Sequence, residues 1–158
     1  MTFGQFIAIL RARFWSALSV CIVTVGGSGV GLSLLRRAID AIPIAQRLVD
    51  GLRFVVVAGP RIDPRALPKR NGVAYHRYVP NLHRHLAACD VAVVQGGLTT
   101  CMELTANRRP FVYVPLQHHF EQNFHVAHRL QRHGAGMRLD YGDAVEPEVL
   151  AAAIASQI

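Results

Sequence analysis

The sequence has few cysteines and few charged residues. Only three of its 158 residues are cysteine, Cys21, Cys89 and Cys101, and no two of them form a Cys-x-x-Cys pair. This spacing argues against a structural zinc site and a disulfide framework, and it is typical of a reducing compartment. Charged residues make up 17% of the chain and hydrophobic residues 51%. That balance excludes intrinsic disorder and indicates one globular domain with its own core.

Dense clusters of charge are also absent. The formal net charge is +7, from 17 basic and 10 acidic residues, yet no run of Lys and Arg is longer than two. Nucleic-acid-binding proteins usually carry a dense basic stripe, so we expect neither DNA nor RNA as a partner. The charge instead favours a small anionic ligand or an anionic membrane surface. No Asp-x-Asp pair is present, and we expect no bound metal.

No hydrophobic run is long enough to cross a membrane. Apolar residues recur at helical spacing in residues 1–19, but Arg11 and Arg13 interrupt them, whereas a membrane-spanning helix needs about 20 apolar residues. The segment also lacks the basic start of a signal peptide. It could be a packing or linker helix, or an amphipathic helix that faces a membrane or a partner. We therefore divide the chain into this segment, 1–19, and one domain, 20–158.

From Val20 onward, short apolar runs alternate with helical patterns. The expected strands are 20–25, 53–59, 72–79, 91–94 and 110–115, with a last short strand within 134–140. The expected helices are one through 34–39, then 80–89, 97–108, 120–133 and one that opens at Pro147. Apolar strands alternating with helices predict an α/β fold, with a Rossmann-like parallel sheet and helices on both faces. Such sheets bind ligands at the carboxyl ends of their strands.

The first expected strand ends in a glycine-rich turn, "TVGGSGVGLSLL" (24–35). Gly27, Ser28 and Gly29 could contact a phosphate or a sugar, because glycines let backbone N–H groups approach an anion. The alternative is a tight turn without a ligand. The spacing is neither the G-x-G-x-x-G of dinucleotide-binding proteins nor a P-loop.

A second polar strand end is "GGLTTCMEL" (96–104). Gly96, Gly97 and Thr99 stand at a helix start, and Glu103 follows one turn later on the same helix face. A carboxylate there could accept two hydrogen bonds from a vicinal diol such as ribose. The alternative is that Thr99 caps the helix and Glu103 is an ordinary solvated acid.

A third polar strand end is "PLQHHFEQNFH" (115–125). Four of its side chains can hydrogen-bond sugar hydroxyls: Gln117, Glu121, Gln122 and Asn123. His118 and His119 could act as a base or as phosphate partners. His125 and His128 are one turn apart, but no third metal ligand is evident. Glycosidase acid pairs, a Gly-x-Ser-x-Gly elbow and a Cys-His nucleophile signature are absent.

In this order, the motifs resemble the C-terminal, donor-binding domain of GT-B UDP-glycosyltransferases. The segments that carry the resemblance are "VTVGGSGVG", "ACDVAVVQGGLTTCMEL", "RRPFVYVPLQHHFEQN" and "RHGAG". They are most similar to the glycosyltransferase family 28 C-terminal domain, found in the bacterial enzyme that adds N-acetylglucosamine to lipid-linked peptidoglycan precursor. The resemblance extends from Val20 to the end of the chain.

The resemblance implies which residues hold the phosphates and the ribose. Residues 27–29 would line the diphosphate. Gly97, Leu98 and Thr99 would offer helix-start N–H groups and a hydroxyl to the same phosphates. Glu103 would accept hydrogen bonds from the ribose hydroxyls.

The resemblance also implies where the two ends of the ligand lie. The uracil would lie against backbone near Tyr78 and Val79, and the transferred sugar would meet Glu121, Gln122 and Asn123. The sequence departs from the family at three positions, and these departures leave the identity of the sugar open. Gln95 stands where many relatives have His or Ser, Glu121 replaces the commoner Asp, and His125 stands where many members carry Asn.

The implied function is the donor half of a metal-independent glycosyltransferase. A UDP-sugar would be the co-substrate, with no further cofactor, and a hexosyl group such as N-acetylglucosaminyl would pass to an acceptor. The family places its acceptor site in an N-terminal domain, which implies a partner domain or chain, in the cytoplasm or at the inner face of the membrane. The catalytic group is not identified, and the candidates are His118, His119 and Glu121. Two alternatives remain: a non-catalytic remnant or nucleotide-sugar-binding module, and a UDP-sugar epimerase.

Overall fold

The computed structural model describes residues 18–26 and 30–158. The expectations for residues 1–17, and for Gly27, Ser28 and Gly29 at the phosphates, fall on residues outside this described part and stay predictions.

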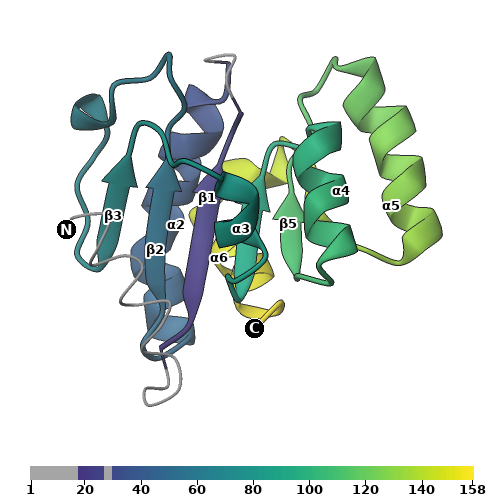
Figure 1. Cartoon of the computed structure of the whole chain (residues 1–158). Coiled ribbons are helices and arrows are strands. Elements are labelled where there is room, and N and C mark those ends of the chain that lie inside the picture. The colour runs from purple at the N-terminus through teal and green to yellow at the C-terminus, as the bar shows by residue number, and fades with distance from the viewer. Residues whose placement is uncertain (1–17, 27–29) are drawn as a thin grey trace.

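Six parallel strands form one sheet in the order β3-β2-β1-β4-β5-β6 (Figure 1). Their bounds are β1 (Val20–Thr24), β2 (Arg53–Val57), β3 (Val73–His76), β4 (Val91–Val94), β5 (Phe111–Tyr113) and β6 (Met137–Arg138). Every residue of β1 and β4 is buried, because these central strands are covered on both faces. The register places Thr24, the last residue of β1, beside Val57 of β2 and Val94 of β4.

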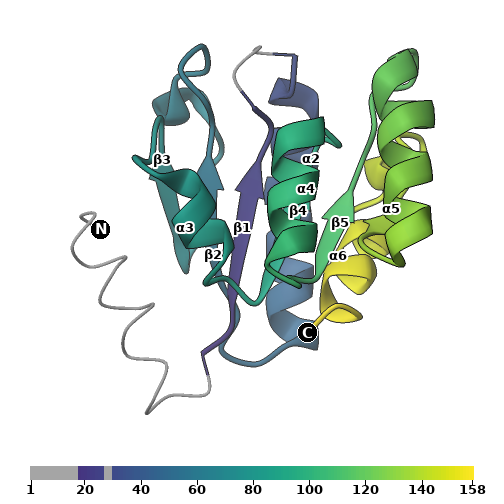
Figure 2. The same cartoon turned by 45° about the vertical axis from the view of Figure 1, so that its right-hand side comes forward.

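Helices cover both faces of the sheet (Figures 1 and 2). One face carries α2 (Leu32–Leu48) and α6 (Pro147–Ala155), and the other carries α3 (Leu82–Leu86), α4 (Leu98–Ala106) and α5 (Ala127–His133). Short helical segments are η2 (Pro64–Ala66), η3 (Glu121–Val126) and η4 (Asp143–Val145). Side chains alternate along β1, so Val23 joins the core under α2 and α6 while Ile22 joins the core under α4 and α5.

The α/β, Rossmann-like fold expected from the sequence is confirmed, and the local differences are small. The helix expected over 120–133 is divided into a π-helical segment, η3, and α5, which is followed by its C-cap Gly134 in a left-handed conformation. The strand expected within 134–140 is only two residues long. Within residues 18–26 and 30–158, no helix combines the length and the apolar character needed to span a membrane.

The strand order creates a switch point between β1 and β4. The chain moves outward from β1 to β2 and β3, then returns to β4 on the other side of β1. The loops after these two strands therefore separate, and open α/β sheets bind their ligands in this crevice. Gly26 and Gly96 follow the two strands with φ values of 75° and 89°, a left-handed conformation that glycine adopts at little cost. A ligand site is therefore expected at the carboxyl ends of β1 and β4.

Candidate functional site

A cavity of about 190 Å³ lies at the switch point, between the loop after β1 and the start of α4. Its lining residues are Thr24, Val25, Gly26, Val94, Gln95, Gly97, Thr100 and Gln122. Gly97 and Gln122 were expected at the site from the sequence, and the cavity brings them together from two polar strand ends. Thr100 and Gln95 were not assigned there.

The start of α4 leaves backbone N–H groups available at this cavity. Gly97 is the N-cap residue and no side chain caps the helix. The first helical hydrogen bond runs from the Cys101 N–H to the Gly97 carbonyl, at 3.1 Å. The N–H groups of Leu98, Thr99 and Thr100 therefore have no partner within the helix. Such a helix start is suited to an anion, because the N–H groups and the helix dipole both favour negative charge.

Thr99 does not cap the helix, so the alternative interpretation of this residue is wrong. The helix begins at Leu98, which places Thr99 inside the first turn with an exposed side chain. A capping hydroxyl would have to stand at the position that Gly97 occupies. The Thr99 hydroxyl thus remains free to meet a ligand.

Gln95 is the most informative residue of the cavity. Its side chain is 6% exposed, and in the described part of the chain its buried Nε2 has no hydrogen-bond partner. An unsatisfied buried donor costs roughly 1–3 kcal/mol, so folded proteins rarely retain one without a reason. An acceptor oxygen of a ligand in the cavity would satisfy it. A polar residue that directly ends an apolar strand could have indicated this role from the sequence.

Gln122 contributes a second amide from the opposite wall. Its Oε1 accepts a hydrogen bond from the Leu116 N–H at 2.9 Å, which leaves the Nε2 hydrogens for a ligand. The cavity lining includes no Lys, Arg, His, Asp or Glu side chain among the described residues. Amide donors, a hydroxyl and helix-start N–H groups without any carboxylate form a site for an anion that needs no cationic side chain.

Glu103 lies on α4, one turn after Thr99, and is half-buried. No ion pair or hydrogen bond of its carboxylate is found among residues 18–26 and 30–158. The carboxylate is therefore available to accept hydrogen bonds from hydroxyl groups beside the helix start.

Two of the other polar residues after β5, Gln117 and Asn123, line a neighbouring cavity of about 340 Å³. Its lining residues are Pro115, Gln117, Asn123, Arg138, Asp140, Tyr141 and Gly142. The expected catalytic candidates His118, His119 and Glu121 are all exposed, and the His119 Nδ1 accepts a hydrogen bond from the Gln122 N–H at 3.4 Å. No group of His, Cys, Asp or Glu residues suited to a metal ion occurs in the described ranges.

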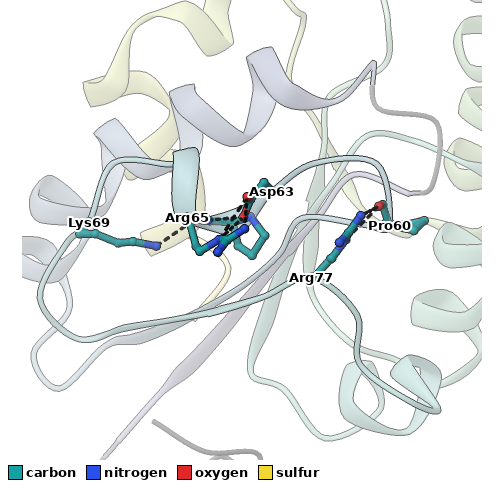
Figure 3. Close-up of polar contacts among 6 residues, drawn as sticks. Pro60, Asp63, Arg65, Lys69 and Arg77 are labelled. Carbon is teal, nitrogen blue, oxygen red and sulfur yellow. Dashed lines mark hydrogen bonds and ion pairs between the residues drawn. The ribbon is translucent and has the colours of Figure 1, made fainter.

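The edge of the site toward β3 is a tightly held loop (Figure 3). Arg77 points to the loop after β2 and donates two hydrogen bonds to the Pro60 carbonyl, at 2.7 and 3.0 Å. The next residue, Tyr78, is 70% exposed, whereas Val79 is buried in the core. Base binding at Tyr78 and Val79 stays a prediction.

Two buried side chains near the site stay neutral. Burial raises the pKa of the Cys101 thiol, on α4, to about 12, so this cysteine packs as an apolar residue and is no nucleophile. Burial also raises the pKa of the Tyr113 phenol on β5, against the opposing effect of the Arg138 guanidinium.

Comparison with known proteins identifies relatives that are longer than this chain. A model of the glycosyltransferase family 28 C-terminal domain matches residues 20–157. An uncharacterised glycosyltransferase of Methanopyrus kandleri is 32% identical over 133 residues, covering 84% of this chain and 34% of that protein. The UDP-N-acetylglucosamine–N-acetylmuramyl-(pentapeptide) pyrophosphoryl-undecaprenol N-acetylglucosamine transferase of Acidothermus cellulolyticus is 29% identical over 136 residues, covering 79% and 36%. The chain spans about a third of the length of these relatives.

Solved structures of glycosyltransferases share the fold. Spinosyn rhamnosyltransferase complexed with thymidine diphosphate superposes with a TM-score of 0.71 at 21% identity, over 90% of this chain and 37% of that one. The calicheamicin glycosyltransferase gives a TM-score of 0.69 at 23% identity, over 88% and 34%.

Proposed function

The chain belongs to the glycosyltransferase family 28 C-terminal domain family, and from this premise we propose that it binds a UDP-hexose at the carboxyl ends of β1 and β4. The observation that carries the proposal is the cavity at the switch point, which is lined by hydrogen-bond donor groups. The Gln95 Nε2, which has no hydrogen-bond partner among the described residues, and the uncapped start of α4 both belong to this cavity. No carboxylate lines it. A diphosphate supplies the acceptor oxygens that this arrangement lacks.

The rest of the nucleotide follows from the position of the diphosphate. Glu103, one turn along α4, would accept hydrogen bonds from both ribose hydroxyls. The uracil would lie toward Tyr78 and Val79, beyond β3. Two similar proteins support these ligand classes by name: a structure that shares the fold was solved with thymidine diphosphate, and a relative is named for UDP-N-acetylglucosamine.

The proposed reaction is transfer of the hexosyl group to an acceptor hydroxyl. The acceptor oxygen attacks the anomeric carbon, the bond from that carbon to the diphosphate oxygen breaks, and a base takes the acceptor proton. The N–H groups at the start of α4 and the amides of Gln95 and Gln122 would stabilise the charge that develops on the departing UDP. These hydrogen-bond donors would stabilise the departing UDP without a metal ion and without a further cofactor.

The acceptor is proposed to lie on another domain or chain. The chain spans about a third of its relatives, and the sheet edge that carries the donor cavity also carries the exposed residues His118, His119 and Glu121. A partner that faces this edge would bring the acceptor to the anomeric carbon. Membrane contact through residues 1–19, and the cytoplasmic location of the pair, belong to the same proposal.

Binding of UDP without divalent metal tests the proposed function. In buffer with EDTA, calorimetry is expected to show saturable UDP binding whose affinity changes less than about twofold when Mg²⁺ replaces the chelator. The reason is that neutral donors and the helix start hold the phosphates. Uridine, which lacks the phosphates, should bind at least about tenfold more weakly, because it makes none of these hydrogen bonds. Binding that appears only with Mg²⁺ or Mn²⁺ would show that the interpretation of the cavity is wrong.

A further inference from the structure

Two neighbouring amide side chains hold both backbone groups of Leu116, in the loop after β5. Gln122 accepts the Leu116 N–H at 2.9 Å, and the Asn123 Nδ2 donates to the Leu116 carbonyl at 2.6 Å. The same Nδ2 donates to the His119 carbonyl at 3.0 Å. Gln117 and His118 lie between the two carbonyls that Asn123 holds, so their backbone is fixed at both ends by one side chain.

Arg138, on the edge strand β6, fixes the orientation of Asn123. Its Nη2 donates to the Asn123 Oδ1 at 2.9 Å, which turns the Nδ2 toward the loop carbonyls. With this contact, the Oδ1 and both hydrogens of Nδ2 are engaged. The two loop carbonyls favour the same orientation of the amide, because the flipped one would place Oδ1 against two carbonyl oxygens, and the guanidinium adds to this preference and anchors Oδ1.

Arg138 is itself held in place by its surroundings. Its Nε donates to Asp140 at 2.9 Å, and it stands in register beside Tyr113 of β5, whose phenol it also contacts. The guanidinium therefore connects the edge strand to η3 and, through Asn123, to the loop after β5. It also lines the cavity of about 340 Å³ that contains Gln117.

We propose that Arg138 is a positioning residue that fixes the loop 115–119 for the transferred sugar and thereby sets the preference of the site for a UDP-hexose over UDP. The inference rests on the proposed function, because the sugar is expected beside the loop after β5 and the diphosphate at α4. Arg138 does not line the α4 cavity. Its effect should consequently fall on the sugar and not on the nucleotide.

The test compares Arg138→Met with the unchanged chain by calorimetry, using UDP, UDP-glucose and UDP-N-acetylglucosamine. The UDP affinity is expected to change by less than about twofold. The ratio of the affinity for the tighter-binding UDP-sugar to the affinity for UDP should fall by about tenfold, which corresponds to the loss of one well-made hydrogen bond. Arg138→Lys should recover part of that ratio, because its ammonium can still donate to the Asn123 Oδ1. Arg132→Met, at an exposed arginine of α5, is the matched control and should leave every affinity unchanged.

Amide hydrogen exchange of the ligand-free chain provides a second readout. In Arg138→Met the Leu116 amide should exchange at least about tenfold faster, whereas the Val114 amide, paired to the Val94 carbonyl at 2.9 Å, should keep its rate. Two binding results for Arg138→Met would overturn the inference: an equal loss of affinity for UDP and the UDP-sugars, or the same preference for the UDP-sugar as in the unchanged chain. It is also overturned if the unchanged chain does not bind a UDP-sugar more tightly than UDP, or if the exchange rate of the Leu116 amide stays the same in Arg138→Met. Failure of the unchanged chain to bind UDP at all contradicts the proposed function instead, and the exchange rate then decides whether Arg138 fixes the loop.

Discussion

The purified chain is expected to bind a UDP-hexose but to transfer no sugar to a simple acceptor by itself. Glycosyl transfer needs an acceptor hydroxyl oriented at the anomeric carbon and a base within hydrogen-bond reach of its proton. The cavity at the switch point is proposed to hold the sugar donor, but the candidate bases His118, His119 and Glu121 are exposed and do not line it. Turnover should appear only when a partner supplies the acceptor site.

The measurement is UDP release with UDP-glucose or UDP-N-acetylglucosamine, with and without the part of the Methanopyrus kandleri relative that this chain does not match. Orientation and general-base catalysis each contribute several orders of magnitude, so the difference should be at least about a thousandfold. Glu103→Ala, which is expected to weaken donor binding, serves as the control that turnover depends on this chain. Robust transfer by the isolated chain would place the acceptor site within these 158 residues and contradict the account. UDP binding with no turnover alongside any partner would favour a non-catalytic nucleotide-sugar-binding module.

Glu103→Ala is expected to weaken UDP binding by about tenfold to a hundredfold without changing the fold. The carboxylate is half-buried and has no partner of its own in the described residues, so its removal leaves no unpaired group behind. Hydrogen bonds to a charged acceptor contribute roughly 1.5–3 kcal/mol, which sets the expected range. Calorimetry with UDP measures the change, and the thermal unfolding midpoint checks the fold.

Two controls separate a ribose contact from a structural role. Glu148→Ala makes the same chemical change at an exposed acid of α6, on the opposite face of the sheet, and should leave UDP affinity unchanged. A UDP analogue without the ribose hydroxyls should bind the unchanged chain and Glu103→Ala equally. Equal losses of UDP and of the analogue in Glu103→Ala would mean that the glutamate supports α4 and does not touch the ribose.

The architecture was predictable because its determinants are local. Apolar runs such as 20–25 and 91–94 must be buried on both faces, and their alternation with helices leaves a parallel sheet as the natural solution. The strand ends then place Gly97 and Gln122 at one crevice. The sequence left open whether Thr99 caps α4, and the structure decides against it by starting the helix one residue after Gly97.

The features that the sequence could not predict depend on contacts between distant residues. Arg138 and Asn123 are 15 residues apart and meet only because β6 pairs with β5 beside η3. The π-helical form of η3 interrupts a pattern that otherwise predicts one continuous helix over 120–133. Gln95 was visible as a departure from the family, but the unsatisfied Nε2 that gives it significance is a property of the packed cavity.

The most direct test of the central claim is a titration of the ¹⁵N-labelled chain with UDP in EDTA, followed by the chemical shifts of its amides. Saturable changes are expected to be largest at the backbone amides of Gly97, Leu98 and Thr99 and at the Gln95 side-chain amide, because these groups are proposed to donate to the phosphates. Residues of α6, on the far face of the sheet, should not respond. Changes centred on another surface, or no saturable change at the start of α4, would contradict the claim that this switch point binds the nucleotide.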